Sequence, residues 1–245
     1  MRLALPPGML TPLLLAPLAT LGFGAVTGLA YLFCYGGFEG PVDWAMNTAS
    51  HGSRDRKQIA LTFDDGPDPL RTPALLDALA ELEAPGTFFV VGKRADASPE
   101  LCARMAREGH ELGNHTYSHP YLPLKSHVTV EAELVATDAA IERATGIVPK
   151  IARPPWGGRR PSTVRAFERH AKKTVLWDVN SYDWKDLPPL DVAQRVVERA
   201  RNGSIILMHD GGRDHTGTIA AVKLVVPELR ARGFELVTVS QALAA

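Results

Sequence analysis

Residues 59–67, Ile59-Ala60-Leu61-Thr62-Phe63-Asp64-Asp65-Gly66-Pro67, contain the pattern that decides the fold class of this chain. The apolar and β-branched residues at 59–63 predict a buried β-strand, and the Asp, Gly and Pro residues at 64–67 predict the polar turn that ends it. Beyond this turn, similar short runs alternate with amphipathic helical stretches to the end of the chain. That alternation is typical of parallel strands joined by helical crossovers.

The alternation predicts an α/β fold with seven strands. We expect them at residues 59–63, 86–91, 111–114, 150–153, 174–179, 204–208 and 235–239. Seven such units favour an incomplete barrel with helices outside, since eight are usual for full closure. Prolines are expected near helix starts and glycines near helix ends, at Thr72-Pro73, Ser98-Pro99, Pro161-Ser162, Gly109, Gly146 and Gly233. Pro227, inside the last long helical stretch, is expected to kink or split it.

Side chains with acid, base or metal-binding chemistry stand where the predicted strands end. In chain order they are Asp64 and Asp65 after the first strand, His115 after the third, Arg153 at the end of the fourth, Asp183 after the fifth and His209 after the sixth. The C-terminal ends of the strands in a β/α barrel gather on one face, where active sites are built. We therefore expect these residues to converge.

Two histidines four residues apart, His115 and His119, suggest a metal site. On one face of a helical turn they present two nitrogens to one ion, although this spacing alone is a weak signal. Asp65 provides a third ligand and leaves open positions for water and substrate. Neighbouring side chains on extended backbone point apart, so Asp64 is expected to remain free as a base. Two histidines and one carboxylate also suit ferrous iron and oxygen chemistry, which remains an alternative.

Five segments carry a family resemblance. They are residues 62–67 (TFDDGP), 115–119 (HTYSH), 153–157 (RPPWG), 183–184 (DW) and 207–209 (LMH). In order and spacing they resemble the five motifs of the polysaccharide deacetylases, the NodB-like carbohydrate esterase family 4 group. The resemblance spans residues 57–245. It implies a distorted (β/α)7 barrel that removes the acetyl group from N-acetylglucosamine in a polymer with the help of a divalent metal.

The resemblance also implies roles for single residues. Asp65, His115 and His119 would hold the metal, usually Zn²⁺, with Co²⁺, Ni²⁺ or Mn²⁺ as alternatives. Asp64 would be the general base and His209 the general acid. The remaining two catalytic positions are Arg153, which would pair with Asp64, and Asp183, which would hold His209.

The substrate-binding positions follow from the same resemblance. Leu207 and Trp184 resemble the pocket for the acetyl methyl group, and the backbone N–H of Trp156 would face the tetrahedral oxyanion. Tyr182 is a candidate for stacking on sugar rings. Asn180 stands where the family has an aspartate, so we expect a structural hydrogen bond to survive there and a charge to be lost.

The N-terminus predicts a membrane-associated, exported protein. Residues 3–38 contain no charged side chain, and residues 13–35 would make a helix of roughly 34 Å, enough to cross a bilayer. We expect residues 1–35 to be an uncleaved transmembrane anchor, with a cleaved signal segment as the alternative. Residues 36–56 are expected to be a tether, and residues 57–245 the catalytic domain. The catalytic domain would then lie outside the cytoplasm, either on the cell membrane or secreted.

The composition excludes several classes of protein. The chain has 245 residues, 45% of them hydrophobic and 22% charged, with a formal net charge of zero and two cysteines. A net charge of zero without a basic patch argues against nucleic acid as a partner. Two cysteines, Cys34 and Cys102, supply neither a disulfide framework nor a thiolate metal cluster.

The expected function is metal-dependent N-deacetylation of a cell-wall or related polysaccharide, with peptidoglycan favoured and chitin-like oligomers as further substrates. One alternative is a deformylase or deacetylase of a lipid-linked aminosugar, which the apolar N-terminus suggests. The other is a catalytically inactive carbohydrate-binding domain that keeps the scaffold.

Overall fold

The computed structural model describes residues 47–185, 187–212 and 216–244. The predicted anchor, Cys34 and the predicted tether up to residue 46 lie outside them. No helix in the described ranges is both long enough and apolar enough to span a membrane.

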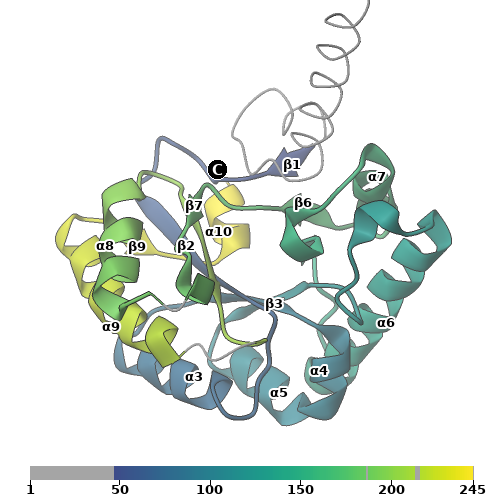
Figure 1. Ribbon diagram of the computed structural model, residues 1–245, viewed down its shortest axis with the longest axis horizontal. Coiled ribbons are helices and arrows are strands. Elements are labelled where there is room, and N and C mark those ends of the chain that lie inside the picture. The colour runs from purple at the N-terminus through teal and green to yellow at the C-terminus, as the bar shows by residue number, and fades with distance from the viewer. Residues whose placement is uncertain (1–46, 186, 213–215, 245) are drawn as a thin grey trace, which may run out of the picture.

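The described residues form one curved parallel sheet with helices around it (Figure 1). The strands are β1 (Thr48–Ala49), β2 (Gln58–Asp64), β3 (Thr87–Val90), β4 (Glu111–Asn114), β5 (Ile151–Ala152), β6 (Lys173–Val175), β7 (Val179–Asn180), β8 (Ile205–His209) and β9 (Glu235–Leu236). Their order is β1-β6-β5-β4-β3-β2-β8-β7, with β9 paired to β2, and every pairing between these strands is parallel.

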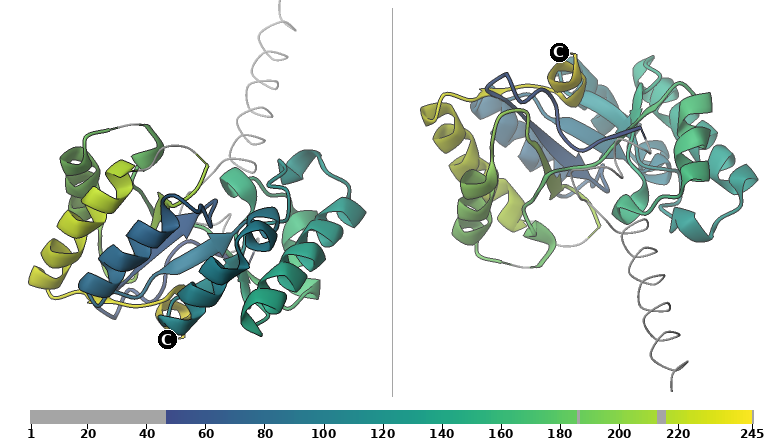
Figure 2. Two further views of the ribbon diagram at one scale, coloured as in Figure 1. Left: turned by 90° about the horizontal axis from the view of Figure 1, so that it is seen from below. Right: turned by 90° about the horizontal axis from the view of Figure 1, so that it is seen from above.

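Eight α-helices and three short 3₁₀ turns connect these strands in the described part of the chain. The helices are α3 (Thr72–Glu81), α4 (Gly92–Ala97), α5 (Pro99–Arg107), α6 (His127–Thr145), α7 (Pro161–Arg169), α8 (Pro189–Arg199), α9 (Thr216–Ala231) and α10 (Val239–Leu243). The 3₁₀ turns are η1 (Leu122–Leu124), η2 (Pro155–Gly157) and η3 (Asp183–Lys185). Helices α8 and α9 lie on one flank of the sheet and α6 and α7 on the other, as the views in Figures 1 and 2 both show.

The side chains of β2 pack on both faces of the sheet, against the helices on the outer face and in a separate apolar cluster on the inner face. Ile59, Leu61 and Phe63 point outward into the main core, where helices cover the sheet, and the Phe63 ring stacks on Phe88 at 5.1 Å. Ala60 points to the opposite face and joins a separate inner cluster with Phe89. Because side chains alternate along a strand, one apolar run serves both layers. Helix α10 contributes to the inner cluster at the end of the barrel where the strands begin.

The predicted incomplete barrel is confirmed, but one predicted strand was wrong. Residues 174–179 do not form a single strand, because the chain changes hydrogen-bond partners within them. The first part, β6, pairs with β5 and β1, and the last part, β7, pairs with β8. Between them Leu176 N donates to Ala49 O at 2.7 Å and Asp178 N donates to Ile205 O at 3.2 Å. The sheet is therefore interrupted between β6 and β7.

The predicted helix boundaries agree with the structure, with one exception. Helices α3, α5 and α7 have proline in their first turn, and Gly146 caps α6 in a left-handed conformation with φ of 73°. The expected split at Pro227 is wrong, since α9 continues through it from Thr216 to Ala231, and the expected kink there stays a prediction.

The folded domain begins before residue 57. Residues 48–49 form β1, and Gly52 N donates to Gly203 O at 2.8 Å. Arg54 forms a 3.0 Å ion pair with the buried Asp178 and donates to Asn202 O at 2.7 Å. Residues 47–56, expected as the end of a tether, are thus packed on the sheet, where they stabilise the edge next to β6.

Candidate active site

The carboxyl ends of the strands bring the candidate catalytic residues together, as the sequence predicts. Asp64 is the last residue of β2, and His209 is the last residue of β8. These strands are paired so that Asp64 lies directly opposite His209. His115 follows β4, and its N–H donates to Val90 O at the end of β3. The face predicted from strand ends is therefore the face that carries the polar cluster.

Asp65, His115 and His119 converge on one point. His119 Nε2 lies 3.0 Å and His115 Nε2 3.4 Å from Asp65 Oδ1. One potential ligand atom from each residue lies within 4.8 Å of the others, which no other group of three or more His, Cys, Asp or Glu residues achieves in the described ranges. This donor set and separation suit a divalent cation such as Zn²⁺.

Left-handed backbone conformations aim these side chains, rather than the helical turn expected for the histidines. Residues 115–119 form a loop in which Thr116 has φ of 66° and His119 has φ of 56°. Asp65 has φ of 74°, so the extended backbone of β2 ends at Asp64. Non-glycine residues rarely adopt this conformation, and such strain clusters at functional sites.

Hydrogen bonds fix the ring of His115 before any ion binds. Its Nδ1 lies 2.8 Å from the carbonyl oxygen of Arg153, which accepts a hydrogen bond from the Nδ1–H group and leaves Nε2 facing Asp65. This is how proteins commonly orient a metal-binding histidine. Burial alone would raise the pKa of Asp65, but the imidazoles of His115 and His119 outweigh it and hold that pKa well below its usual range.

A second network supports the loop that carries the histidines. Asn114 Oδ1 accepts from Thr116 N at 2.9 Å, and Asn114 Nδ2 donates to Asp138 Oδ1 at 2.8 Å. The other oxygen of Asp138 pairs at 2.7 Å with Lys172, whose side chain is fully buried. The chain of contacts from Lys172 to Thr116 therefore anchors the loop to α6.

Arg153 holds Asp64 from below the site. Its Nη1 donates to Asp64 Oδ1 at 2.7 Å and to Thr62 Oγ1 at 2.8 Å, and its Nη2 donates to Leu176 O at 2.7 Å. The guanidinium is completely buried and stacks on the Phe89 ring at 4.0 Å. Asp64 is thus oriented by a fixed cation, and its Oδ2 lies 3.7 Å from His115 Nε2 without joining the three-residue cluster.

Asp183 holds His209 in the same manner. Asp183 Oδ1 lies 2.9 Å from His209 Nδ1, and the other oxygen accepts from His209 N and Thr218 Oγ1, both at 2.8 Å. Burial opposes the charged imidazole, but the contact with Asp183 and the charges of Asp64 and Asp65 raise the pKa of His209 to about 9. His209 is therefore a proton donor at neutral pH.

A cleft of about 430 Å³ opens above these groups. Trp156, Trp184 and Leu207 line it, as the sequence predicts. Trp156 is 57% exposed and Trp184 41% exposed, so both present aromatic surface to a ligand. The cleft thus combines a candidate metal-binding cluster, the carboxylate held by Arg153 and the imidazole held by Asp183 with apolar walls.

The sequence of this chain is similar to those of known polysaccharide deacetylases. The family model for polysaccharide deacetylase matches residues 51–175. A peptidoglycan-N-acetylglucosamine deacetylase of Bacillus cereus is 37% identical over 191 residues, which cover 77% of this chain and 89% of the relative. The chain belongs to the polysaccharide deacetylase family. A peptidoglycan-N-acetylmuramic acid deacetylase of Bacillus subtilis is 40% identical over 187 residues, covering 76% of this chain and 39% of that protein.

The fold agrees with the family as well. The crystal structure of a peptidoglycan N-acetylglucosamine deacetylase superimposes with a TM-score of 0.80 at 32% identity, covering 83% of this chain and 97% of that one. The similarity therefore includes almost the whole of the solved relative.

Some residues of the cleft differ from the sequence-based expectation. Trp177, which packs against the inner cluster, lines the cleft, and so does Gly212. Tyr182 is not part of the described lining, because its ring packs between the cations of Lys185 at 4.3 Å and Arg195 at 4.1 Å. Sequence patterns do not reveal whether Trp177 and Tyr182 face the cleft, since the directions of these side chains depend on how the chain enters and leaves β7.

Asn180, the departure from the family pattern, also lines the cleft. Its Oδ1 accepts from Tyr182 N at 2.9 Å, which is the structural hydrogen bond that the sequence predicts. An amide therefore serves the turn after β7 as an aspartate would, without a negative charge.

Asp210 is a buried acid that sequence analysis missed. Its Oδ2 accepts from Thr72 Oγ1 at 2.6 Å. Burial is the main cause that raises the pKa of Asp210 to about 7, and the negative charges of Asp65 and Asp64 raise it further. The hydrogen bond from Thr72 lowers this pKa and offsets only part of the increase. A Cβ at Gly66 would lie 2.1 Å from Asp210 Oδ2, so this turn requires glycine.

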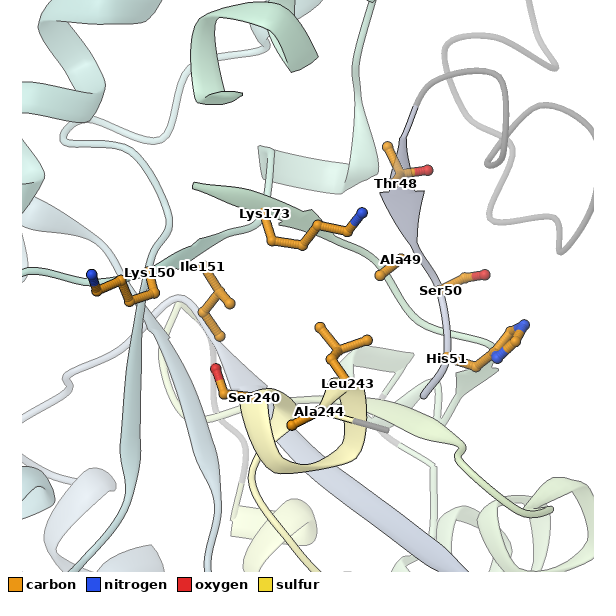
Figure 3. Close-up of a pocket in the computed structure, with 10 residues that line it drawn as sticks. All are labelled: Thr48, Ala49, Ser50, His51, Lys150, Ile151, Lys173, Ser240, Leu243 and Ala244. Atoms are coloured by element: carbon orange, nitrogen blue, oxygen red, sulfur yellow. The ribbon is translucent and has the colours of Figure 1, made fainter. Parts of the chain in front are cut away.

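A second cavity, of about 820 Å³, lies at the opposite end of the barrel (Figure 3). Its walls include Lys150, Lys173 and Ser240, of which Lys173 donates to Asn47 and Ser240 donates to Glu111. His51 is the one imidazole of its described lining, which contains no carboxylate. The N-terminal face of a β/α barrel commonly serves stability, and this cavity lacks the groups for hydrolysis.

Proposed function

We propose that this protein is a metal-dependent hydrolase that removes N-acetyl groups from N-acetylglucosamine-type residues of a cell-wall polysaccharide, with peptidoglycan as the main substrate. The observation that carries the proposal is the presence, in one cleft, of the Asp65, His115 and His119 cluster between a held carboxylate and a held imidazole. Family membership and the peptidoglycan deacetylases among the relatives support it.

Asp65, His115 and His119 would hold the ion, for which Zn²⁺ suits the two imidazoles and one carboxylate best. A divalent cation bound there supplies Lewis acidity, which makes water more acidic and polarises the amide carbonyl. All three residues line the cleft, so three protein ligands would leave room there for water and substrate. The protein's own groups must then move the protons.

Asp64 is the proposed general base. Its Oδ1 is occupied by Arg153, so Oδ2 is the oxygen that accepts the proton of the attacking water. Arg153 keeps the carboxylate oriented and compensates its charge in a buried site. Adding water to the amide carbon gives a tetrahedral oxyanion on the substrate.

His209 is the proposed general acid. An amide nitrogen leaves poorly unless it is protonated, and its proton would come from His209 Nε2, because Asp183 engages Nδ1. The proton that His209 gives up goes to the nitrogen as the carbon–nitrogen bond breaks, which yields acetate and the free amine. Asp183 is therefore a positioning residue that also keeps the imidazole charged.

The backbone N–H of Trp156 is the proposed donor to the oxyanion. It follows Pro155 with φ of 54° and donates to no acceptor in the described part of the chain. Backbone donors of this kind stabilise charge that develops in the transition state. Leu207 and Trp184 would receive the methyl group, and the exposed face of Trp156 would pack against a sugar ring.

The catalytic domain would act outside the cytoplasm, where peptidoglycan lies, with residues 1–35 as its membrane anchor. The support is the uncharged segment at residues 3–38. N-terminal sequencing of the mature protein, together with its distribution between membrane and soluble fractions, separates an anchor from a cleaved signal.

The decisive assay measures acetate release by the metal-loaded protein from peptidoglycan and from N-acetylglucosamine oligomers. Asp64→Asn, which keeps the shape but removes the base, should lower the rate by about 10²- to 10⁴-fold. Formate release and a lipid-linked aminosugar substrate test the alternative activity. Absence of acetate release from every glycan would contradict the proposal.

A further inference from the structure

A second groove adjoins the catalytic cleft and is lined by two cations. It has a volume of about 460 Å³ and shares Asp65, His119 and Gly212 with the cleft. Lys93 and Arg94 stand on its other wall. The groove therefore begins where the acetyl-bearing sugar would bind and continues from the Asp65, His115 and His119 cluster toward Lys93 and Arg94.

Backbone hydrogen bonds connect the segment that carries these two cations to the loop that carries His115 and His119. Gly92 N donates to Thr116 O at 3.0 Å and Lys93 N donates to Tyr117 O at 2.9 Å, so α4 begins on the loop that carries the histidines. Arg94 Nη1 lies against Gly211, where a Cβ would approach it to 2.5 Å. The start of α4 is thus tied to the histidine loop, and the Arg94 guanidinium lies beside Gly211, whereas the Lys93 side chain is exposed.

Neither cation has an ion-pair partner within the described part of the chain. The side chains of Lys93 and Arg94 form no hydrogen bond or ion pair with a described residue. Among the nearby carboxylates, Asp96 pairs with Arg143 and Glu133 accepts from Ser118. Asp65 lines the same groove, and the buried Asp210 interacts with the charge of Arg94. Two unpaired cations beside a substrate cleft favour an anionic ligand.

We infer that Lys93 and Arg94 form a subsite for a carboxylate on a sugar next to the one that is deacetylated. This inference rests on the proposed function and adds a preference to it. In peptidoglycan, alternate sugars are N-acetylmuramic acid, whose ether-linked lactyl group has a free carboxylate where no stem peptide is attached and an amide where one is, whereas chitin-like oligomers are neutral. The subsite makes the enzyme prefer an alternating, carboxylate-bearing glycan over a neutral one.

The test compares two tetrasaccharides of alternating N-acetylglucosamine and N-acetylmuramic acid, one with free lactyl carboxylates and one with those groups converted to methylamides. For the wild-type enzyme we expect kcat/KM about fivefold higher on the free acid, a preference that declines with added salt. The Lys93→Gln, Arg94→Gln double variant should lose this preference and keep its rate on the methylamide.

A matched control removes the same charge elsewhere. Arg107 on α5 and Lys150 at the opposite end of the barrel are exposed. The Arg107→Gln, Lys150→Gln double variant should keep the wild-type preference. An equal preference in wild type and the Lys93, Arg94 variant would overturn the subsite.

A binding measurement separates this inference from the proposed function. Affinities of the two tetrasaccharides for Zn²⁺-loaded Asp64→Asn protein, with and without the Lys93 and Arg94 substitutions, require no turnover. Tighter binding of the free acid that depends on the two cations would support the subsite even if wild type released no acetate, in which case the proposed function alone fails. Equal binding of both tetrasaccharides by an enzyme that does release acetate would overturn the subsite alone.

Discussion

Asp183 binds His209 at two points, with one carboxylate oxygen 2.9 Å from Nδ1 and the other 2.8 Å from the backbone nitrogen. The two contacts fix both the ring and the end of the strand that carries it. Because the backbone contact anchors β8 to the turn after β7, this pair connects the architecture of the barrel to the proton chemistry of the cleft.

The pair predicts the alkaline limit of activity. The pKa of His209 is raised to about 9, so the acid form is present below that pH and is lost as the pH rises through it. In the pH profile of kcat, we expect a decline above pH 9. Asp183→Asn removes the main cause that raises this pKa and leaves burial, which lowers it, so the decline should move to lower pH. An unchanged alkaline limb in a variant that melts as wild type does would contradict this assignment.

The buried Arg153 predicts a joint loss of stability and rate. Arg153→Lys keeps the charge but cannot reach Asp64, Thr62 and Leu176 O together. We expect the free energy of unfolding to fall by about 2–4 kcal/mol and kcat by about a hundredfold. Denaturant unfolding and steady-state kinetics measure the two effects. Thr62→Val, which leaves the Arg153–Asp64 pair in place, should have a smaller effect on kcat; an equal effect would argue against positioning by Arg153.

The network behind the histidine loop predicts a change in metal affinity. Asn114→Ala removes the acceptor for Thr116 N and the partner of Asp138. We expect Zn²⁺ affinity to fall by about 10- to 100-fold in a competition titration with a chelator. Asn202→Ala removes an amide that is half-buried rather than buried and donates to Arg54 O, far from the cleft, and it should leave the affinity unchanged. Equal affinities for all three proteins would rule out the role of Asn114.

Local patterns were sufficient to predict the barrel and the convergence of its site. The apolar runs set the strands, and parallel strands force their carboxyl ends to one face, so Asp64, His115 and His209 meet without any further information. What the sequence could not supply depends on tertiary contacts. β1 has two residues and acquires its conformation from β6, and Asp210 is buried because of Gly66 and Thr72, which are distant in the chain.

The start of the folded domain is therefore open to a direct test. A chain that begins at residue 47 keeps β1 and the Arg54–Asp178 pair, whereas a chain that begins at residue 57 loses both. Without Arg54, the buried Asp178 loses a partner while burial still opposes its charge. We expect the free energy of unfolding of the shorter chain, measured by urea denaturation, to be about 2–4 kcal/mol lower than that of the longer chain. Equal stability would show that residues 47–56 contribute nothing to the fold.

The central claim is that one cation held by Asp65, His115 and His119 is required for deacetylation. Its most direct test is titration of the metal-stripped protein with Zn²⁺ while acetate release from peptidoglycan is recorded. We predict a rate that rises in proportion to added Zn²⁺ and saturates at one equivalent per chain, with His119→Ala showing neither tight binding nor activity. Full activity in the stripped protein, or in His119→Ala without bound metal, would contradict the account.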